Sequence, residues 1–369
     1  MLARANGRPP FRADHIGSLL RPAELRQAFK DHQAKRIDNA HFTQIQDRCI
    51  RDVIALQEAA GLRVVSDGEL RRGSYWGRFA ERIDGFVIKP AAFKFRDDRG
   101  NEVDFTATYA AEELSRRKPL ALDEFIFLRD ATTATPKITL PAPSTMHFYR
   151  CTDFADPRVY ANAESFFADL TRIFRDEIAA LATAGARYVQ FDEVALALLC
   201  DPAIRAKVEA AGVKPDRLVD LYIEVINEAV AGAPGEVIFG VHVCRGNFKG
   251  HYLSAGGYES VAERFFAGTR VNHFLLEYDT ARAGDFSPLR FVKDKGVVLG
   301  LISSKVPALE SIAELKQRTL EAARHIDLDR LAISPQCGFA STVAGNPVSE
   351  ADERAKLKLV VDAAHEIWG

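Results

Sequence analysis

The sequence predicts a single (β/α)₈ barrel, an α/β fold of the TIM type, over residues 1–369, with a long insertion after the second strand. Two observations lead to this prediction. Short apolar runs rich in strand-forming residues alternate with longer segments of helical periodicity. Eight such runs occur, and repeated strand–helix units imply a parallel sheet that eight strands can close into a barrel.

The expected strands share an apolar composition and are bounded by turn residues. They are Ala13–Ser18, Val64–Gly68, Lys137–Pro143, Tyr188–Glu193, Val237–Cys244, His273–Tyr278, Val297–Ser303 and Leu331–Cys337. The first is weak by itself because it is short and partly polar. An open, doubly wound sheet is the alternative, but it usually carries a glycine-rich turn for a dinucleotide, and the sequence has no G-x-G-x-x-G.

Helices are expected between the strands, where apolar residues recur at helical spacing. They cover Phe42–Ala60, Glu164–Ala184, Arg217–Ala231, Ser260–Ala267, Ala308–Ala323 and Glu350–Ile367. Gly185 is typical of a residue that ends a helix, and Ser349 with Asp352 predicts a capped start for the last one.

The regular alternation is interrupted by about 68 residues between the second and third strands, which we treat as an insertion at about 70–136. It contains the aromatic block RRGSYWGRF and a predicted hairpin around Arg99–Gly100. Long loops in barrels are usually functional, so we expect a lid in which Tyr75, Trp76 and Phe79 exclude water or stack on a flat ligand. The alternative is an excursion that only packs on the outside.

Composition excludes several classes of protein. The net charge is −2 with both signs interspersed, which argues against nucleic acid as a partner. No apolar run reaches the roughly 18 residues of a membrane helix, and the basic N-terminal stretch has no apolar block behind it, so we expect neither a membrane span nor a secretory leader. Five cysteines, an odd number, predict no disulfide framework and a reducing cytoplasm.

Metal-ligand residue types gather at the carboxyl ends of the predicted strands, where barrel enzymes carry their working residues. His242 and Cys244 lie two apart on one strand and therefore share a face. Cys337 ends the last strand, and Glu277 or Asp279 ends the sixth. His242, Cys244, Glu277 and Cys337 would complete a tetrahedral zinc site. The alternative is a buried histidine beside an apolar cysteine, which is how we interpret Cys49, Cys151 and Cys200.

The first, second and fourth strands end in the blocks HIGS, SDGE and QFDE. These blocks offer His15, Ser18, Asp67, Glu69, Asp192 and Glu193 at the same rim. Several carboxylates at one mouth suit a cationic group such as an α-amine. For any one of these residues, Asp67 and Ser18 above all, the alternative is a helix N-cap at the turn between a strand and the next helix.

Six blocks together resemble the catalytic barrel of the cobalamin-independent methionine synthases. They are HIGS (15–18), DGE (67–69), QFDE (190–193), HVCRGNF (242–248), LLEYD (275–279) and SPQCGF (334–339), in family order across nearly the whole chain. The resemblance implies a (β/α)₈ barrel and Zn²⁺ held by the four residues above. It also implies that Ile16, Gly17 and Ser18, with Glu69 and Asp192, bind the amino acid part of homocysteine; we add His15 and Trp76 to this substrate-binding set.

Two departures from the family concern the methyl donor. Full-length members carry an extra N-terminal barrel, and the chain resembles the short stand-alone group without it. The family also has a histidine acid in a block reading roughly D-I-H-S-P-R-V-P, where this sequence reads GLISSKVP and places Ile302. No catalytic acid is therefore assigned, and the donor is left between 5-methyltetrahydrofolate and another donor such as a methylcorrinoid.

The predicted activity is zinc-dependent methyl transfer to homocysteine, giving methionine, with small molecules as partners and a homo-oligomer left open. One alternative is alkylation of another thiol, such as opening of an epoxide by coenzyme M. Ser18, Glu69 and Asp192 favour an amino acid thiol, because residues that bind an amino acid group have no use with a sulfonate thiol. The other alternative is a structural zinc or thiol-sensing protein, against which the expected carboxylate ligand argues.

Overall fold

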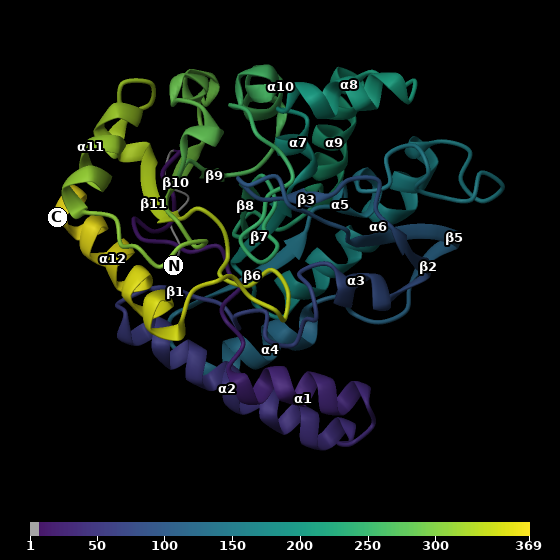
Figure 1. Ribbon diagram of the computed structural model, residues 1–369, viewed down its shortest axis with the longest axis horizontal. Helices are drawn as coiled ribbons and strands as arrows, with labels where there is room; N and C mark the ends of the chain where they lie inside the picture. The colour runs from purple at the N-terminus through teal and green to yellow at the C-terminus, as the bar shows by residue number, and fades with distance from the viewer. Residues whose placement is uncertain (1–6) are drawn as a thin grey trace.

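A computed structural model describes residues 7–369. Residues 1–6, part of the N-terminal stretch expected not to be a leader, lie outside the described residues. The chain curls a parallel sheet of seven strands, with helices packed around it (Figure 1). The strands, in their order across the sheet, are β1 (Val64–Val65), β6 (Thr135–Pro141), β7 (Tyr188–Glu193), β8 (Ile238–Val243), β9 (His273–Glu277), β10 (Gly296–Ile302) and β11 (Leu331–Pro335).

The N-terminal segment 12–19 occupies the eighth position of the barrel, between β11 and β1. It pairs with β11 at Ala13 and Ile333, and the amide of Leu19 donates to the carbonyl of Gly68 at 3.0 Å. We expected a strand at Ala13–Ser18, but the segment is extended without being a regular strand, because side chains bind its carbonyls. Those of His15, Ile16 and Gly17 accept from Lys137 Nζ, Gln190 Nε2 and Ser66 Oγ, respectively.

The expected helices are all present with small shifts at their ends. They are α2 (Asn39–Ala59), α6 (Ala163–Thr183), α9 (Pro215–Val230), α10 (Glu259–Gly268), α11 (Ile312–Ala322) and α12 (Glu350–Trp368). The predicted start of α11 at Ala308 is wrong because Ser311 caps the helix and accepts from the amide of Glu314. At α12 the predicted cap is confirmed as a capping box of Ser349 and Asp352.

Sequence analysis missed the helices α1 (Ala23–Gln33), α4 (Leu122–Ala131) and α8 (Pro202–Ala210), together with shorter ones. The shorter helices are α3 (Gly77–Glu81), α5 (Thr145–Phe148), α7 (Ala195–Leu198), η1 (Ala281–Ala283), η2 (Ser287–Phe291) and η3 (Leu328–Arg330). No helix within residues 7–369 combines the length and the apolar character needed to cross a membrane.

The insertion after β1 contributes two antiparallel hairpins. The predicted hairpin around Arg99–Gly100 is confirmed, with β3 (Phe95–Arg96) paired to β4 (Glu102–Val103). The larger one joins β2 (Ile83–Pro90) to β5 (Thr106–Arg116) and was not predicted. Phe79, which we expected in a lid, is fully buried in the main apolar core.

The interior of the barrel holds a polar network at the amino-terminal ends of the strands. Asp14 Oδ1 accepts from Lys137 Nζ at 2.8 Å, and Asp14 Oδ2 accepts from the Tyr188 hydroxyl at 2.7 Å. The same hydroxyl lies 2.7 Å from His273 Nε2. All four side chains are buried, so burial of a charged pair is accompanied by hydrogen bonds that satisfy it.

Candidate metal and substrate site

Three predicted ligands meet at the carboxyl-terminal end of the barrel. His242 lies on β8, Cys244 directly after it, and Cys337 two residues after β11. Their ligand atoms all lie within 4.8 Å of one another, and all three residues are buried. The closed barrel therefore brings together side chains that are 93 residues apart in the sequence.

The spacing of these atoms fits a tetrahedral metal. The two sulfurs are 3.8 Å apart. Two thiolates that each lie about 2.3 Å from one zinc ion at a tetrahedral angle would be about 3.8 Å apart, whereas a disulfide needs about 2.05 Å. His242 Nδ1 lies 3.2 Å from the carbonyl of Leu275, while its Nε2 finds no hydrogen-bond partner within residues 7–369. That orientation is typical of a metal-binding histidine.

Glu277, the fourth predicted ligand, lies outside this three-residue group. Its Oε2 accepts from the amide of Arg245 at 2.7 Å, and its buried Oε1 has no hydrogen-bond partner in the described part of the chain. Burial raises the pKa of Glu277, but Lys305 and Arg245 outweigh it and lower that pKa below its ordinary value. Glu277 thus offers a charged oxygen beside the cluster.

Asp279, the alternative to Glu277, has the opposite electrostatics. Burial, and then the charge of Glu277, raises the pKa of Asp279 to about 6. Both of its carboxylate oxygens lack a partner among the described residues. Of the two acids, Glu277 is therefore the better anionic ligand.

The pKa values of the two cysteines are shifted in opposite directions. The hydrogen bond with Cys244, and then the charge of nearby His242, lowers the pKa of Cys337 well below its ordinary value, although burial opposes this. The same hydrogen bond, together with burial, raises the pKa of Cys244 well above its ordinary value. Cys337 is thus the better thiolate, and a metal ion would replace the proton that holds the cluster together.

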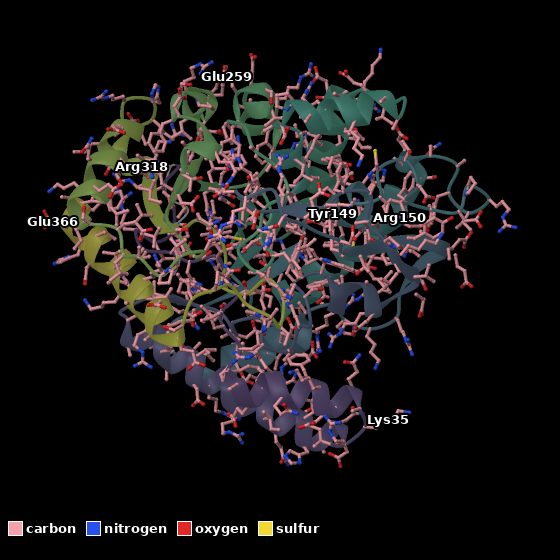
Figure 2. All side chains as sticks on the ribbon, viewed as in Figure 1. Lys35, Tyr149, Arg150, Glu259, Arg318 and Glu366 are labelled. Carbon is pink, nitrogen blue, oxygen red and sulfur yellow. The ribbon has the colours of Figure 1, made fainter. Side chains whose placement is uncertain are left out.

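A small cavity of about 40 Å³ lies beside the cluster. Its walls come from the strand ends and from the insertion, which contributes Tyr75 and Phe95. Tyr149, labelled near the middle of the molecule in Figure 2, follows α5, and its hydroxyl lies 2.8 Å from that of Tyr75. The remaining lining residues are Ile16, Ser18, Glu69, Asp192, Val194, His242, Cys244, Gly246, Asn247, Cys337, Gly338 and Ser341.

Two buried carboxylates face this cavity. Glu69 adopts a positive φ of 58°, a conformation that non-glycine residues rarely adopt. Its Oε1 accepts from Thr139 at 2.7 Å, while its buried Oε2 has no partner within residues 7–369. Burial, and then the charge of Glu69, raises the pKa of Asp192 to about 7. A cation between the two acids would relieve their repulsion.

Ser18 reaches the cavity because residue 338 is glycine. A Cβ on Gly338 would collide with Ser18 Oγ. The amide of Phe339 donates to the carbonyl of Ser18 at 2.9 Å, and Asn247 Nδ2 donates to the carbonyl of Gly338 at 2.8 Å. Ser18 is therefore held against the loop that carries Cys337.

Three other residues predicted to bind substrate, Gly17, His15 and Trp76, are not among the residues that line the cavity. Gly17 has a φ of 137°, and a Cβ there would meet Thr139. His15 is buried, and burial, then Lys137, lowers its pKa to about 3, so its ring is neutral. Trp76 precedes α3 and packs against the main core. Ile302 is fully buried in that same core.

The acids that sequence analysis left between two roles serve local structure. Asp67 Oδ1 accepts from the amide of Glu69 at 2.9 Å, within the turn after β1. Glu193 accepts from Ser144 and, at 2.9 Å, from the amide of Leu196. Neither of these acids lines the cavity.

Sequence analysis missed several residues that line the cavity: Phe95, Tyr149, Val194, Gly246, Asn247, Gly338 and Ser341. Gly246, Asn247 and Gly338 carried a usable signal, because they lie in the blocks that hold the ligands. The aromatic pair comes from hairpin and loop segments, whose position over the barrel cannot be inferred from periodicity.

Known proteins resemble the chain over most of its length. The family model described as the catalytic domain of cobalamin-independent synthases matches residues 11–214 and 279–366. Cys337 lies inside these ranges, whereas His242, Cys244 and Glu277 lie between them and rest on the geometry above. The uncharacterized protein YxjH of Bacillus subtilis is 38% identical over 97% of this chain and 95% of its own length.

Two further relatives have functional names. A methionine synthase of Pyrococcus abyssi is 28% identical over 88% of this chain and 85% of its own length. The crystal structure of a putative vitamin-B12-independent methionine synthase from Listeria monocytogenes has a TM-score of 0.77 and 30% identity, covering 99% of this chain and all of that one.

Proposed function

The chain belongs to the cobalamin-independent synthase family, and on that premise we propose that it transfers a methyl group to the thiol of homocysteine, forming methionine. The observation that carries the proposal is the juxtaposition of a His–Cys–Cys cluster with a cavity walled by two carboxylates. The cluster suits a thiol, and the carboxylates suit the α-amine of an amino acid.

The cofactor that these residues fit is Zn²⁺. His242, Cys244 and Cys337 would hold it, and the unpartnered Oε1 of Glu277 is the nearest candidate for a fourth, exchangeable position. When bound, zinc supplies the positive charge that keeps a substrate thiol deprotonated at neutral pH. Lys305 and Arg245 keep Glu277 ionised, which preserves it as a ligand.

The carboxylates orient the amino acid. Glu69 Oε2 and Asp192 would accept hydrogen bonds from the α-ammonium group, and Ser18 Oγ would contact the other end of the backbone. Charge-assisted hydrogen bonds of this kind are about twice as strong as neutral ones. A substrate held at both ends has its sulfur fixed toward the cysteines, which supplies the entropic advantage of the reaction.

The aromatic side chains over the cavity exclude water. Tyr75 and Tyr149 are joined by their hydroxyls, and Phe95 is 7% exposed. Burial raises the pKa of both tyrosines, so each stays protonated at neutral pH. These three side chains cover the reacting atoms and do not transfer a proton as acids at neutral pH.

For the donor we propose 5-methyltetrahydrofolate or a methylcorrinoid. Ile302 cannot donate a proton, and it is buried in the core rather than exposed in the cavity. The leaving group therefore takes its proton from water or leaves without one. The alternative thiol, coenzyme M, would set a sulfonate against Glu69 and Asp192, which disfavours it.

The test is to quantify zinc in the purified protein and to assay methionine formation from homocysteine with methylfolate, as mono- and polyglutamate, and with methylcobalamin. Cys337→Ala is expected to lose the zinc and nearly all activity, because it removes the better thiolate. Cys151→Ala, a partly exposed cysteine outside the site, is the matched control and should keep both. Stoichiometric zinc in Cys337→Ala would remove that residue from the site.

A second variant separates binding of the amino acid substrate from binding of zinc. Asp192→Asn should raise the KM for homocysteine about 10- to 100-fold and leave zinc content unchanged, since a hydrogen bond to a charged group contributes about 1.5–3 kcal/mol. Equal loss of zinc and affinity would instead indicate a folding defect.

A further inference from the structure

A second, much larger hollow lies beside the barrel mouth. It has a volume of about 1660 Å³ and is walled by α1, α2 and α4, the first turns of the insertion, and residues 343–344. Figure 1 shows α1 and α2 lying side by side as an antiparallel pair below the barrel, with α4 next to them. The turn between the pair is marked by Lys35 in Figure 2. We call this hollow the helical groove.

The helical groove is basic although the whole chain has a net charge of −2. Its lysines and arginines are Arg26, Lys30, Arg51, Arg71, Arg78 and Lys118. They outnumber its acids, which are Glu81, Asp123 and Asp130. The local field therefore attracts anions, whereas the protein as a whole repels them weakly.

Several of these cations have no acid beside them. Lys30 and Arg51 are exposed, and neither forms an ion pair within 4.0 Å among residues 7–369. By contrast, Arg71 pairs with Asp47 at 2.5 Å, and Arg78 pairs with Asp123 at 2.9 Å. Positive charge therefore remains in the groove for a ligand to neutralise.

Apolar rings lie between the cations. The guanidinium groups of Arg51 and Arg71 stand 5.1 and 4.8 Å from the ring centroid of Phe127. Phe29 and Phe42 pack edge to face at 5.0 Å, and Ile126 is 37% exposed in the same groove. Arginines and aromatic rings together are the composition of protein interfaces and their energetic centres.

The size of the groove favours a protein segment over a small molecule. Small-molecule sites usually have volumes of about 300–1,000 Å³, and this groove exceeds that range. A net positive, aromatic-lined groove between helices matches the recognition of acidic protein segments by arginine clusters.

The groove shares a wall with the reaction cavity. Residues 73–75 pair with 341–343: the amide of Tyr75 donates to Ser341 at 2.9 Å, and that of Val343 donates to Gly73 at 3.0 Å. Tyr75 and Ser341 face the cavity, whereas Gly73 and Val343 face the groove. A molecule in the groove thus touches the backbone pair that closes the cavity.

We propose that the helical groove docks an acidic segment of a partner protein beside the mouth of the active site. This inference goes beyond the proposed function, because it concerns binding that is measured without turnover. The carboxylates of the segment pair with Lys30, Arg51 and Lys118, and its apolar side chains pack on Phe127 and Ile126.

The experiment measures binding of a fluorescein-labelled acidic peptide of about twelve residues, mostly glutamate with some leucine and phenylalanine, by fluorescence anisotropy. Wild-type protein should bind it, and more weakly as salt rises from about 50 to 300 mM. Lys30→Glu with Arg51→Glu should weaken binding at least about tenfold, because two attractive contacts become repulsive. The charge-matched control, Lys214→Glu with Arg324→Glu, changes two exposed cations elsewhere and should bind normally.

Four outcomes would overturn the proposal. They are absence of peptide binding to wild-type protein, unchanged binding by the groove variant, equal weakening in the control, and equally effective competition by inorganic tripolyphosphate. The last would indicate a site for small polyanions. Sedimentation of the wild-type protein and of the groove variant tests whether the groove binds a second copy of this chain instead. Dimers that form in the wild-type protein and are lost in the groove variant alone would show that it does, and would also overturn the proposal.

Discussion

The two ends of the barrel treat buried charge in opposite ways. At the amino-terminal ends of the strands, both oxygens of Asp14 are used, by Lys137 and Tyr188. At the carboxyl-terminal ends, Glu69 Oε2, Glu277 Oε1 and His242 Nε2 lack a partner within residues 7–369. The carboxylate of Asp14 is therefore satisfied by neighbouring side chains, whereas the atoms of Glu69, Glu277 and His242 are left for a ligand.

This difference separates polar groups that hold the fold from polar groups that hold ligands. An unsatisfied buried polar atom costs about 1–3 kcal/mol, so a chain retains several together only where a bound molecule offsets that cost. Burial alone does not distinguish the two ends, because Asp14 and Glu277 are both fully buried. The two acids differ in their hydrogen bonds, since both oxygens of Asp14 have partners and Oε1 of Glu277 has none among residues 7–369.

The largest expected effect breaks the satisfied end. Lys137→Met should lower the free energy of unfolding by about 3–5 kcal/mol, because it leaves Asp14 buried without its cation. Urea titration measures the change. Lys316→Met, which breaks the exposed pair with Glu366 (the latter labelled in Figure 2), should have a much smaller effect. Equal effects of the two substitutions would mean that the buried pair adds nothing specific.

The next effect uses pH to contrast the acids of the two ends. The pKa of Asp192 is raised to about 7, mainly by burial and then by Glu69, so its folded form binds a proton that the unfolded chain releases above about 4. As pH rises from about 4 to 7, the free energy of unfolding of the wild-type protein should therefore fall relative to that of Asp192→Asn, by about 2–4 kcal/mol in total.

The pKa of Asp14 is shifted in the opposite direction, so its effect on stability has the opposite dependence on pH. Lys137 and further polar neighbours overcome the effect of burial and lower the pKa of Asp14, so its contribution is present above its unfolded pKa and lost as pH falls through the folded one. Asp14→Asn should thus be less stable than the wild-type protein at neutral pH. The difference in their free energies of unfolding should shrink only as pH falls below about 4. Unfolding titrations at several pH values compare both variants, and parallel curves would contradict the contrast.

A smaller effect sharpens the ligand-binding end without touching a charge. Gly338→Ala should displace the Ser18 hydroxyl and raise the KM for homocysteine by about tenfold, equivalent to about 1.4 kcal/mol, with zinc retained. Ser18→Ala should have the same effect, and the double variant should add little to either. Additive effects would show that the two residues act independently.

The smallest effect lies outside both ends. Ser349→Ala removes the hydroxyl of the capping box at α12 and should cost about 1 kcal/mol of stability. Thermal unfolding measures it, and activity at a temperature well below the transition should be unchanged. A loss of activity there would connect α12 to the site, which its position does not suggest.

Sequence patterns predicted the barrel well where burial follows chain order. Every residue of β7, β8 and β10 is buried, as expected for a parallel sheet covered on both sides, and their bounds were close to those expected. The segment at Ala13 was harder, because side-chain donors such as Gln190 replace strand partners. A periodicity argument cannot anticipate such donors.

The predicted site shows the same division. His242, Cys244 and Cys337 could be placed together because strand ends share one rim of a barrel. Phe95 and Tyr149 could not, since they reach the cavity from a hairpin and a loop whose docking depends on tertiary packing. Glu69 belongs between these cases: its position was expected, but its positive φ was not.

The backbone pair between residues 73–75 and 341–343 has a mechanical consequence. Only four residues separate Cys337 from Thr342. The segment 341–343, which pairs with residues 73–75, is therefore joined to the sulfur ligand by a short stretch of chain. Any displacement of Tyr75 that admits a substrate larger than the cavity pulls on the loop of Cys337. We therefore expect a displacement of Tyr75 on substrate entry to change the position of the Cys337 loop as well.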